Sequence, residues 1–142
     1  MIVADTGALI ALLDADDRHH RALRALFEAD PDAWVLPWAI LPEVDYLAGT
    51  HLGSRVQEAF QADLAAELFR VEWGSVEDLG RSNALSRRHR ALRLGLVDAV
   101  VIVTAERLQA DTIATLDLRH FAAVPIRGNP RLVPRDLERP AR

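Results

Sequence analysis

The chain has 142 residues, half of them hydrophobic, and a formal net charge of −4. This length and apolar content predict a single domain over residues 1–142 with a core of its own. The absence of cysteine excludes disulfides, thiolate-bound zinc and a cysteine nucleophile, and it is compatible with the reducing cytoplasm, where we expect the protein to act. No stretch of 18 residues is free of charge and no signal peptide is visible, so we expect no membrane association.

The predicted elements of the first half alternate between strands and helices. We expect strands at 2–5 and 34–36, and helices at 6–13, 19–28, from about Pro42 to Gly49 or Gly53, and 56–68. Thr6 is the expected N-cap of the first helix.

The second half continues the alternation. We expect an edge strand at 69–73, a helix at 75–89 capped by Ser75, a helix from 96 or 97 to 110, a strand at 112–116 and a last edge strand at 124–126. The tail after about residue 128 has little apolar pattern, so we expect it to be loosely ordered. The alternation predicts an α/β fold with a parallel sheet covered on both faces by helices.

Four carboxylates occupy informative places in this pattern. Asp5 and Asp117 each follow a short apolar strand, whereas Glu43 and Asp98 each stand at the start of an apolar helix. The carboxyl ends of parallel strands border the crevice in which open α/β sheets bind ligands. Acids that converge there cannot all stay ionised without cations between them, and oxygen ligands favour Mg²⁺ or Mn²⁺. The sequence therefore predicts a divalent-metal site.

Each acid also has a simpler interpretation. Asp5 could end its strand or cap the next helix, although Thr6 offers a cap of its own. Glu43 is favoured in a first helical turn by the helix dipole, and Asp117 could be a turn residue. Asp98 is almost the only polar group in an apolar helix, which favours a site role. On the residues alone, Asp5 and Asp98 are the firmest candidate ligands.

Other polar residues carry weaker signals. Thr6 and Thr115 could hydrogen-bond the neighbouring carboxylates. The five histidines share no metal-ligand spacing, so most are expected on the surface, and the three tryptophans are expected in the core or a protein interface. All 17 basic residues are arginine, and the densest run, from Arg87 to Arg93, is either a solvated helix end or a patch that contacts nucleic-acid phosphates.

Four motifs in order resemble the PIN domain, and more narrowly the VapC-type toxin ribonucleases of bacterial toxin–antitoxin pairs. They are Ile-Val-Ala-Asp5-Thr-Gly-Ala, Leu-Pro-Glu43-Val, Leu-Val-Asp98-Ala and Ile-Ala-Thr115-Leu-Asp117-Leu-Arg-His-Phe. The resemblance extends from Ile2 to about Ile126. It implies a three-layer α/β/α sandwich with a mostly parallel sheet, and it implies that Asp5, Glu43, Asp98 and Asp117 are the catalytic and metal-binding residues.

The resemblance also implies an activity and partners. The activity is Mg²⁺- or Mn²⁺-dependent endoribonuclease cleavage of RNA by a metal-activated water. The partners are a small VapB-like antitoxin, which lays a helix into an apolar groove formed by the second to fourth helices, and a second copy of the chain. Two alternatives stay open: a catalytically quiet PIN-fold binding protein, and a related metal-dependent DNase or structure-specific nuclease.

Overall fold

The computed structural model describes residues 1–137, which contain one five-stranded parallel sheet. The strands lie in the order β3-β2-β1-β4-β5, so the first strand of the chain is central. Their bounds are β1 Ile2–Ala4, β2 Trp34–Pro37, β3 Arg70–Glu72, β4 Thr112–Ala114 and β5 Arg131–Val133.

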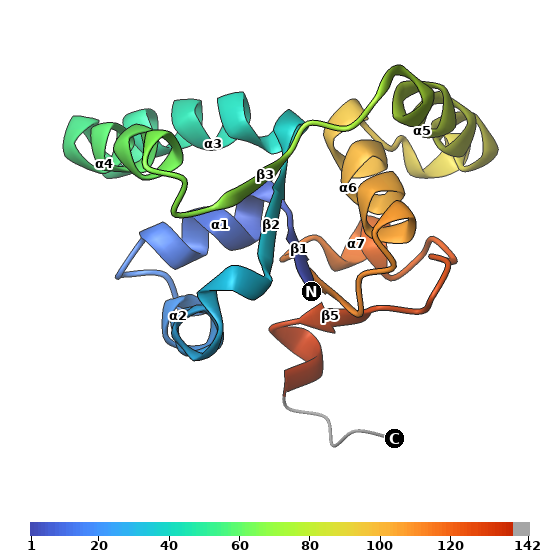
Figure 1. The fold of residues 1–142 in the computed structure, drawn as a ribbon. Helices are drawn as coiled ribbons and strands as arrows, with labels where there is room; N and C mark the ends of the chain where they lie inside the picture. Colours follow the sequence, from blue (N-terminus) through green and yellow to red (C-terminus); the bar gives the residue numbers. More distant parts are fainter. Residues whose placement is uncertain (138–142) are drawn as a thin grey trace.

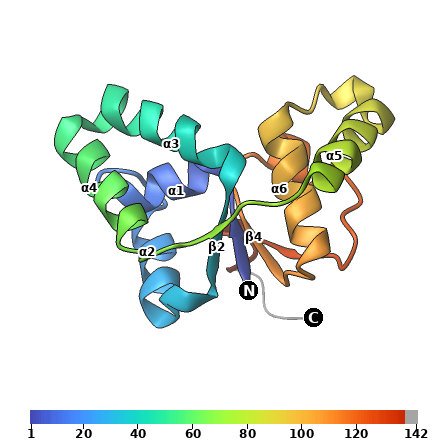
Figure 2. The same cartoon turned by 45° about the horizontal axis from the view of Figure 1, so that its top comes forward.

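Helices cover both faces of this sheet. Those of eight residues or more are α1 Thr6–Leu13, α2 His20–Ala29, α4 Ser54–Ala65, α5 Val76–Arg88 and α6 Leu96–Arg107, and the shorter ones are α3 Leu41–Leu47 and α7 Leu118–Phe121. Helices α1 to α4 lie on one side of the sheet and α5 to α7 on the other (Figure 1, Figure 2). The predicted α/β fold with three layers is confirmed.

Helix α6 is the central element of its layer. Every residue from Ala99 to Ala105 is buried, and the helix packs on β1 and β2 as well as on α5 and α7. Because this middle part of α6 is enclosed on nearly all sides, its sequence from Ala99 to Ala105 is almost wholly apolar rather than amphipathic. This packing fixes the start of the helix, and therefore Asp98 in its first turn, beside the sheet.

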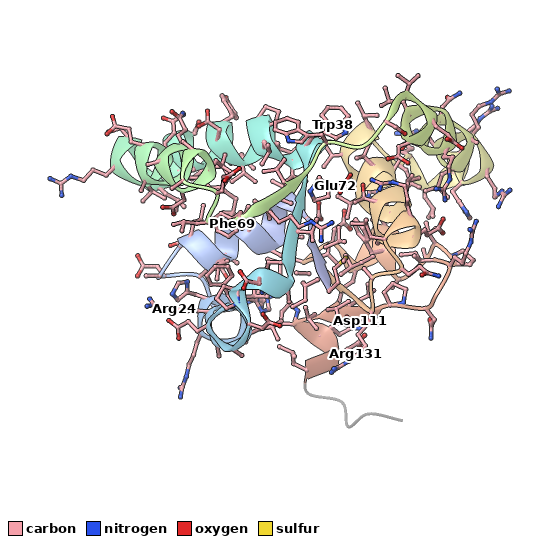
Figure 3. The ribbon with its side chains drawn as sticks, in the orientation of Figure 1. Arg24, Trp38, Phe69, Glu72, Asp111 and Arg131 are labelled. Carbon is pink, nitrogen blue, oxygen red and sulfur yellow. The ribbon has the colours of Figure 1, made fainter. Side chains whose placement is uncertain are left out.

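An aromatic cluster lies on the other side of the sheet. The ring of Phe27 lies 5.7 Å from that of Trp34 and 5.4 Å from that of Phe69. The ring of Phe69, which Figure 3 labels, also lies 6.3 Å from that of Phe60. The expected core position is confirmed for Trp34, and Phe60 and Phe69 are also buried. Trp73 is 71% exposed, so for this residue the other expected place, a protein interface, stays a prediction.

The last strand was predicted at the wrong place. Residues 124–126 form no strand, whereas Arg131–Val133 pairs with β4, and the Thr115 amide donates to the Val133 carbonyl at 3.0 Å. The expectation of a loosely ordered tail is therefore wrong through residue 137, because hydrogen bonds to β4 hold a segment whose own apolar pattern is weak. Residues 138–142 lie outside the described residues. Within the described chain, no helix has the length and apolar character of a membrane span.

Candidate metal and catalytic site

The predicted site residues lie at the carboxyl edge of the sheet. Strands β1 and β4 are neighbours in register, with Ala4 opposite Ala114, so the residues that follow them emerge side by side. The Asp5 amide donates to the Ala114 carbonyl at 2.8 Å and continues this pairing by one residue. The sheet itself therefore brings Asp5 next to the segment that carries Asp117.

Asp5 has a structural role as well as a candidate chemical one. Its backbone is extended, and its Oδ1 accepts a hydrogen bond from the Thr6 amide at 2.8 Å, so Asp5 is the N-cap of α1. The prediction that Thr6 is the cap is wrong, because Thr6 is already the first helical residue. Asparagine is also a favourable N-cap, so Asp5→Asn would remove the charge and keep the cap.

Thr115 links the two acids that follow the strands. Its hydroxyl donates to Asp5 Oδ2 at 3.0 Å, and the same oxygen accepts from the Asp117 amide at 3.0 Å. The contact between Thr115 and a carboxylate, expected from the sequence, is confirmed. Thr115 is buried, so this bridge holds the two acids in a fixed arrangement.

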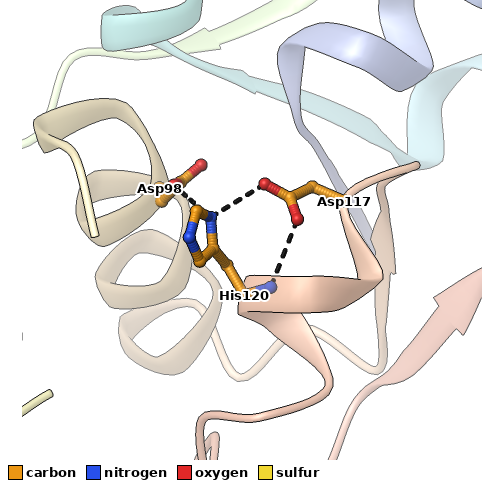
Figure 4. A group of neighbouring side chains, drawn as sticks. All are labelled: Asp98, Asp117 and His120. Atoms are coloured by element: carbon orange, nitrogen blue, oxygen red, sulfur yellow. Dashed lines mark hydrogen bonds and ion pairs between the residues drawn. The ribbon is translucent and has the colours of Figure 1, made fainter. Parts of the chain in front are cut away.

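Asp98 and Asp117 meet at a histidine (Figure 4). The Nδ1 of His120 lies 3.0 Å from Asp98 Oδ2 and 2.8 Å from Asp117 Oδ2, while Asp117 Oδ1 accepts from the His120 amide at 3.2 Å. One atom of each residue lies within 4.8 Å of the others, a spacing compatible with a shared metal ion. Most of the histidines were expected on the surface, and His120 is an exception, because only 16% of its side chain is exposed.

The acids influence one another through their charges. Burial raises the pKa of Asp5 to about 6; hydrogen bonds from Thr6 and Thr115 oppose the rise, and the charges of Asp98 and Asp117 add to it. Burial also raises the pKa of Asp98, against the attraction of His120 and with the repulsion of Asp117 and Glu43. A cation among these groups would offset the cost of burying charged carboxylates and would reduce the repulsion between them.

Glu43 stands at the margin of the site. It is exposed in the first turn of α3, and its influence on Asp98 is electrostatic. The structure thus groups Asp5, Asp98 and Asp117, adds His120, and leaves Glu43 exposed on α3, where its charge helps to raise the pKa of Asp98.

The residues present fit a divalent cation. Asp98, Asp117 and His120 can each offer one ligand atom, and Asp5 adds a buried carboxylate beside them. The hydroxyl of Thr6 is buried without a hydrogen-bond partner among the described residues, so a polar group at this edge would satisfy it. Carboxylates suit Mg²⁺ and Mn²⁺, whereas an imidazole nitrogen is a usual ligand of transition metals rather than of Mg²⁺.

Comparison with known proteins gives one consistent result. The PIN domain family model matches residues 2–126. Ribonuclease VapC26 of Mycobacterium tuberculosis is 31% identical over 128 residues, which cover 89% of this chain and 95% of that protein.

Solved structures agree with this match. M. tuberculosis VapC20, described as a sarcin-ricin loop cleaving toxin, matches with a TM-score of 0.72 at 22% identity. The match covers 80% of this chain and 87% of the VapC20 chain. A chain of a toxin–antitoxin complex from Klebsiella pneumoniae matches with a TM-score of 0.66 at 25% identity, and the match covers 88% of this chain and 93% of that chain. This chain, with its acids at the carboxyl edge of a parallel sheet, belongs to the PIN domain family and to its VapC-type members.

Proposed function

We propose that this protein is a Mg²⁺- or Mn²⁺-dependent endoribonuclease and the toxin of a toxin–antitoxin pair. The observation that supports this proposal most is the convergence of Asp5, Asp98 and Asp117 at one edge of the sheet. It is joined by the similarity of 89% of this chain to a ribonuclease. RNA is a cytoplasmic substrate, so we propose the cytoplasm as the place of action.

The proposed roles follow from the geometry. Asp5, Asp98 and Asp117 would hold the cation, with Glu43 and His120 completing the site from α3 and α7. When bound, the cation would activate water and offset the charge that develops on the scissile phosphate. Thr115 positions Asp5 and Asp117 through its two hydrogen bonds, so the carboxylates are arranged before substrate arrives.

An antitoxin and a second copy of this chain are the proposed protein partners. The Klebsiella relative was solved as a toxin–antitoxin complex, which supports a small antitoxin that covers α2 to α4. Tyr46 on α3 is 69% exposed and Leu68, after α4, is 59% exposed, so apolar side chains are available there. For the homodimer, the support is an apolar stripe formed by Trp73, Val76 and Leu79, which are exposed by 71%, 85% and 42%.

The activity is tested with Asp98→Asn and Asp5→Asn, assayed on single-stranded RNA with Mg²⁺ or Mn²⁺. We expect the cleavage rate of each variant to fall at least about a hundredfold, because one charged ligand is removed while the fold persists. Asp45→Asn is the matched control, since Asp45 is on α3 but bonds Gln57 and Gln61, away from the site.

The proposal would be contradicted if the Asp5→Asn, Asp98→Asn double variant cleaved RNA like the natural sequence. Circular dichroism of each variant checks that the fold is retained. Cleavage of DNA in preference to RNA would instead favour the alternative of a metal-dependent DNase.

A further inference from the structure

A concave site lies on the α5–α6 side of the molecule, outside the acidic centre. It is a pocket of about 470 Å³ between α5, α6 and the segment 125–127. Its polar wall contains Arg81, Arg88, His89 and Arg127, and its apolar wall contains Leu85 and Ile126. We call it the arginine pocket. None of these residues belongs to the candidate metal site.

The arginine pocket carries an excess of positive charge. Its one acidic lining residue, Glu106, is engaged on both oxygens: Oε2 accepts from Arg81 at 3.2 Å and Oε1 from the Arg127 amide at 3.0 Å. Glu106 therefore offsets the charge of Arg81 only. The guanidinium groups of Arg88 and Arg127 have no acidic partner within residues 1–137, so the pocket favours an anion.

The apolar wall narrows the class of anion. Leu85 and Ile126 pack partly buried against the hydrophobic core, and Val103 beneath them is 2% exposed. A pocket that needs only to hold a phosphate gains nothing from such a wall, whereas a nucleotide presents a phosphate and a flat apolar base together. The pocket volume also lies within the range of small-molecule sites, which is larger than one phosphate requires.

Helix α6 connects the arginine pocket to the acidic centre. Asp98 is in the first turn of this helix, and the pocket residues Val103 and Glu106 lie about 7 and 12 Å further along its axis, at about 1.5 Å per residue. At roughly 3.4 Å per nucleotide, the spacing along one strand of a stacked double helix, this distance corresponds to about two to four nucleotides. One RNA strand could therefore reach both places.

We propose that the arginine pocket binds one nucleotide of the RNA whose scissile phosphate lies at the acidic centre. Arg88 and Arg127 bind its phosphate, and the wall of Leu85 and Ile126 receives its base. The inference rests on the proposed function, and it assigns a role to part of the basic run at residues 87–93. A peptide of acidic residues alone, such as polyglutamate, would use the two arginines but would leave the apolar wall without a matching group.

The test measures RNA binding without cleavage. Binding of a fluorescent single-stranded RNA of mixed sequence is measured in EDTA for the natural sequence and for the Arg88→Ala, Arg127→Ala variant. We expect the variant to bind at least about tenfold more weakly, and the slope of log affinity against log salt to become shallower by about 0.7 for each phosphate that the variant no longer neutralises. Arg21→Ala, Arg55→Ala is the matched control, because both arginines are exposed on α2 and α4 and the net charge changes equally.

A competition arm separates the ligand classes. We expect adenosine monophosphate to displace the RNA at lower concentration than inorganic phosphate or a polyglutamate peptide does. The proposal is overturned if the pocket variant binds RNA no more weakly than the control variant, or if polyglutamate or phosphate competes as well as the nucleotide.

The two proposals fail in different ways. If Asp98→Asn abolishes cleavage while Arg88→Ala, Arg127→Ala leaves both KM and binding unchanged, the pocket assignment fails and the activity stands. If no RNA is cleaved but binding depends on the arginine pair, the activity fails and the pocket assignment stands.

Discussion

The Asp5 carboxyl combines burial with a neighbourhood of like charges. Only 5% of the residue is exposed, and its pKa of about 6 lies well above the ordinary 3.8. Below pH 3.8 both the folded and unfolded chains carry the proton. Between pH 3.8 and 6 the unfolded chain ionises first, so the free energy of unfolding falls as pH rises through this window. Above pH 6 Asp5 is ionised in both states, and its burial lowers the free energy of unfolding by the full amount, of the order of 3 kcal/mol.

Asp5→Asn should therefore stabilise the protein in EDTA at pH 7.5. The asparagine removes the buried charge and keeps the N-cap, so we expect a melting temperature several degrees higher, by about 2–4 °C for each kcal/mol. The gain should shrink towards pH 4.5, where the natural protein holds its proton. With Mn²⁺ we expect the natural protein to have the higher melting temperature, because the bound ion stabilises the natural sequence and not the variant. A gain that is the same at both pH values would contradict this account.

His120 shows which part of the site the sequence did not disclose. The acids were recognisable because each follows a strand or begins an apolar helix, and Thr115 because it neighbours one of them. His120 had a weaker signal, its position three residues after Asp117 at the start of a helix. Its contact with Asp98 depends on how α7 packs against α6, which no local pattern encodes.

At the level of elements, an ion network ties the end of α6 to β3 and α5. Arg107 donates to both oxygens of Asp78, at 3.1 and 3.0 Å, and to Glu72 at 2.8 Å. The Asp78 side chain is 6% exposed, so it depends on this partner. The prediction of Ser75 as the cap of α5 is confirmed, and the Asp78 carboxylate faces Arg107 from the first turn of the same helix.

Arg107→Met should destabilise the fold by about 2–3 kcal/mol, because it leaves a buried carboxylate without its cation. Arg24→Met is the matched control: Arg24 pairs with Glu28 on α2 at 2.7 Å, but both side chains are about 60% exposed, and we expect a cost of at most about 0.5 kcal/mol. Urea denaturation measures both values. Equal costs in the two variants would show that the network on α6 contributes no more than a surface pair.

The strands illustrate why some elements were predictable and one was not. The segments that became β1 and β2 are wholly buried and apolar, and β4 is buried at Ile113 and Ala114, so their patterns suffice. Residues 124–126 (Val-Pro-Ile) and 131–133 (Arg-Leu-Val) are both short segments with two apolar residues and a proline within or beside them. The second becomes β5 because Ile113 and Ala114 of β4 pair with Leu132 and Val133, a choice made by tertiary contact.

At the scale of the whole molecule, exposed apolar side chains at the start of α5 offer a surface for dimer formation. The apolar stripe of Trp73, Val76 and Leu79 follows a spacing of three residues, so Val76 and Leu79 share one face of α5. A two-fold dimer uses the same surface on both subunits, and an exposed stripe of one helix can meet its own copy across such an axis. Trp73 would supply the large side chain that interfaces favour.

We therefore expect the natural protein to be a dimer whose dissociation depends on this stripe. Trp73→Ala should weaken the dimer by about 2 kcal/mol, or roughly thirtyfold in Kd, and Val76→Glu, Leu79→Glu should give a monomer. Leu68→Glu is the control, because Leu68 is 59% exposed but follows α4 on the other side of the sheet. Sedimentation equilibrium over a range of concentrations measures the association. A natural sequence that stays monomeric, or a stripe variant that still dimerises, would exclude the stripe as the dimer interface.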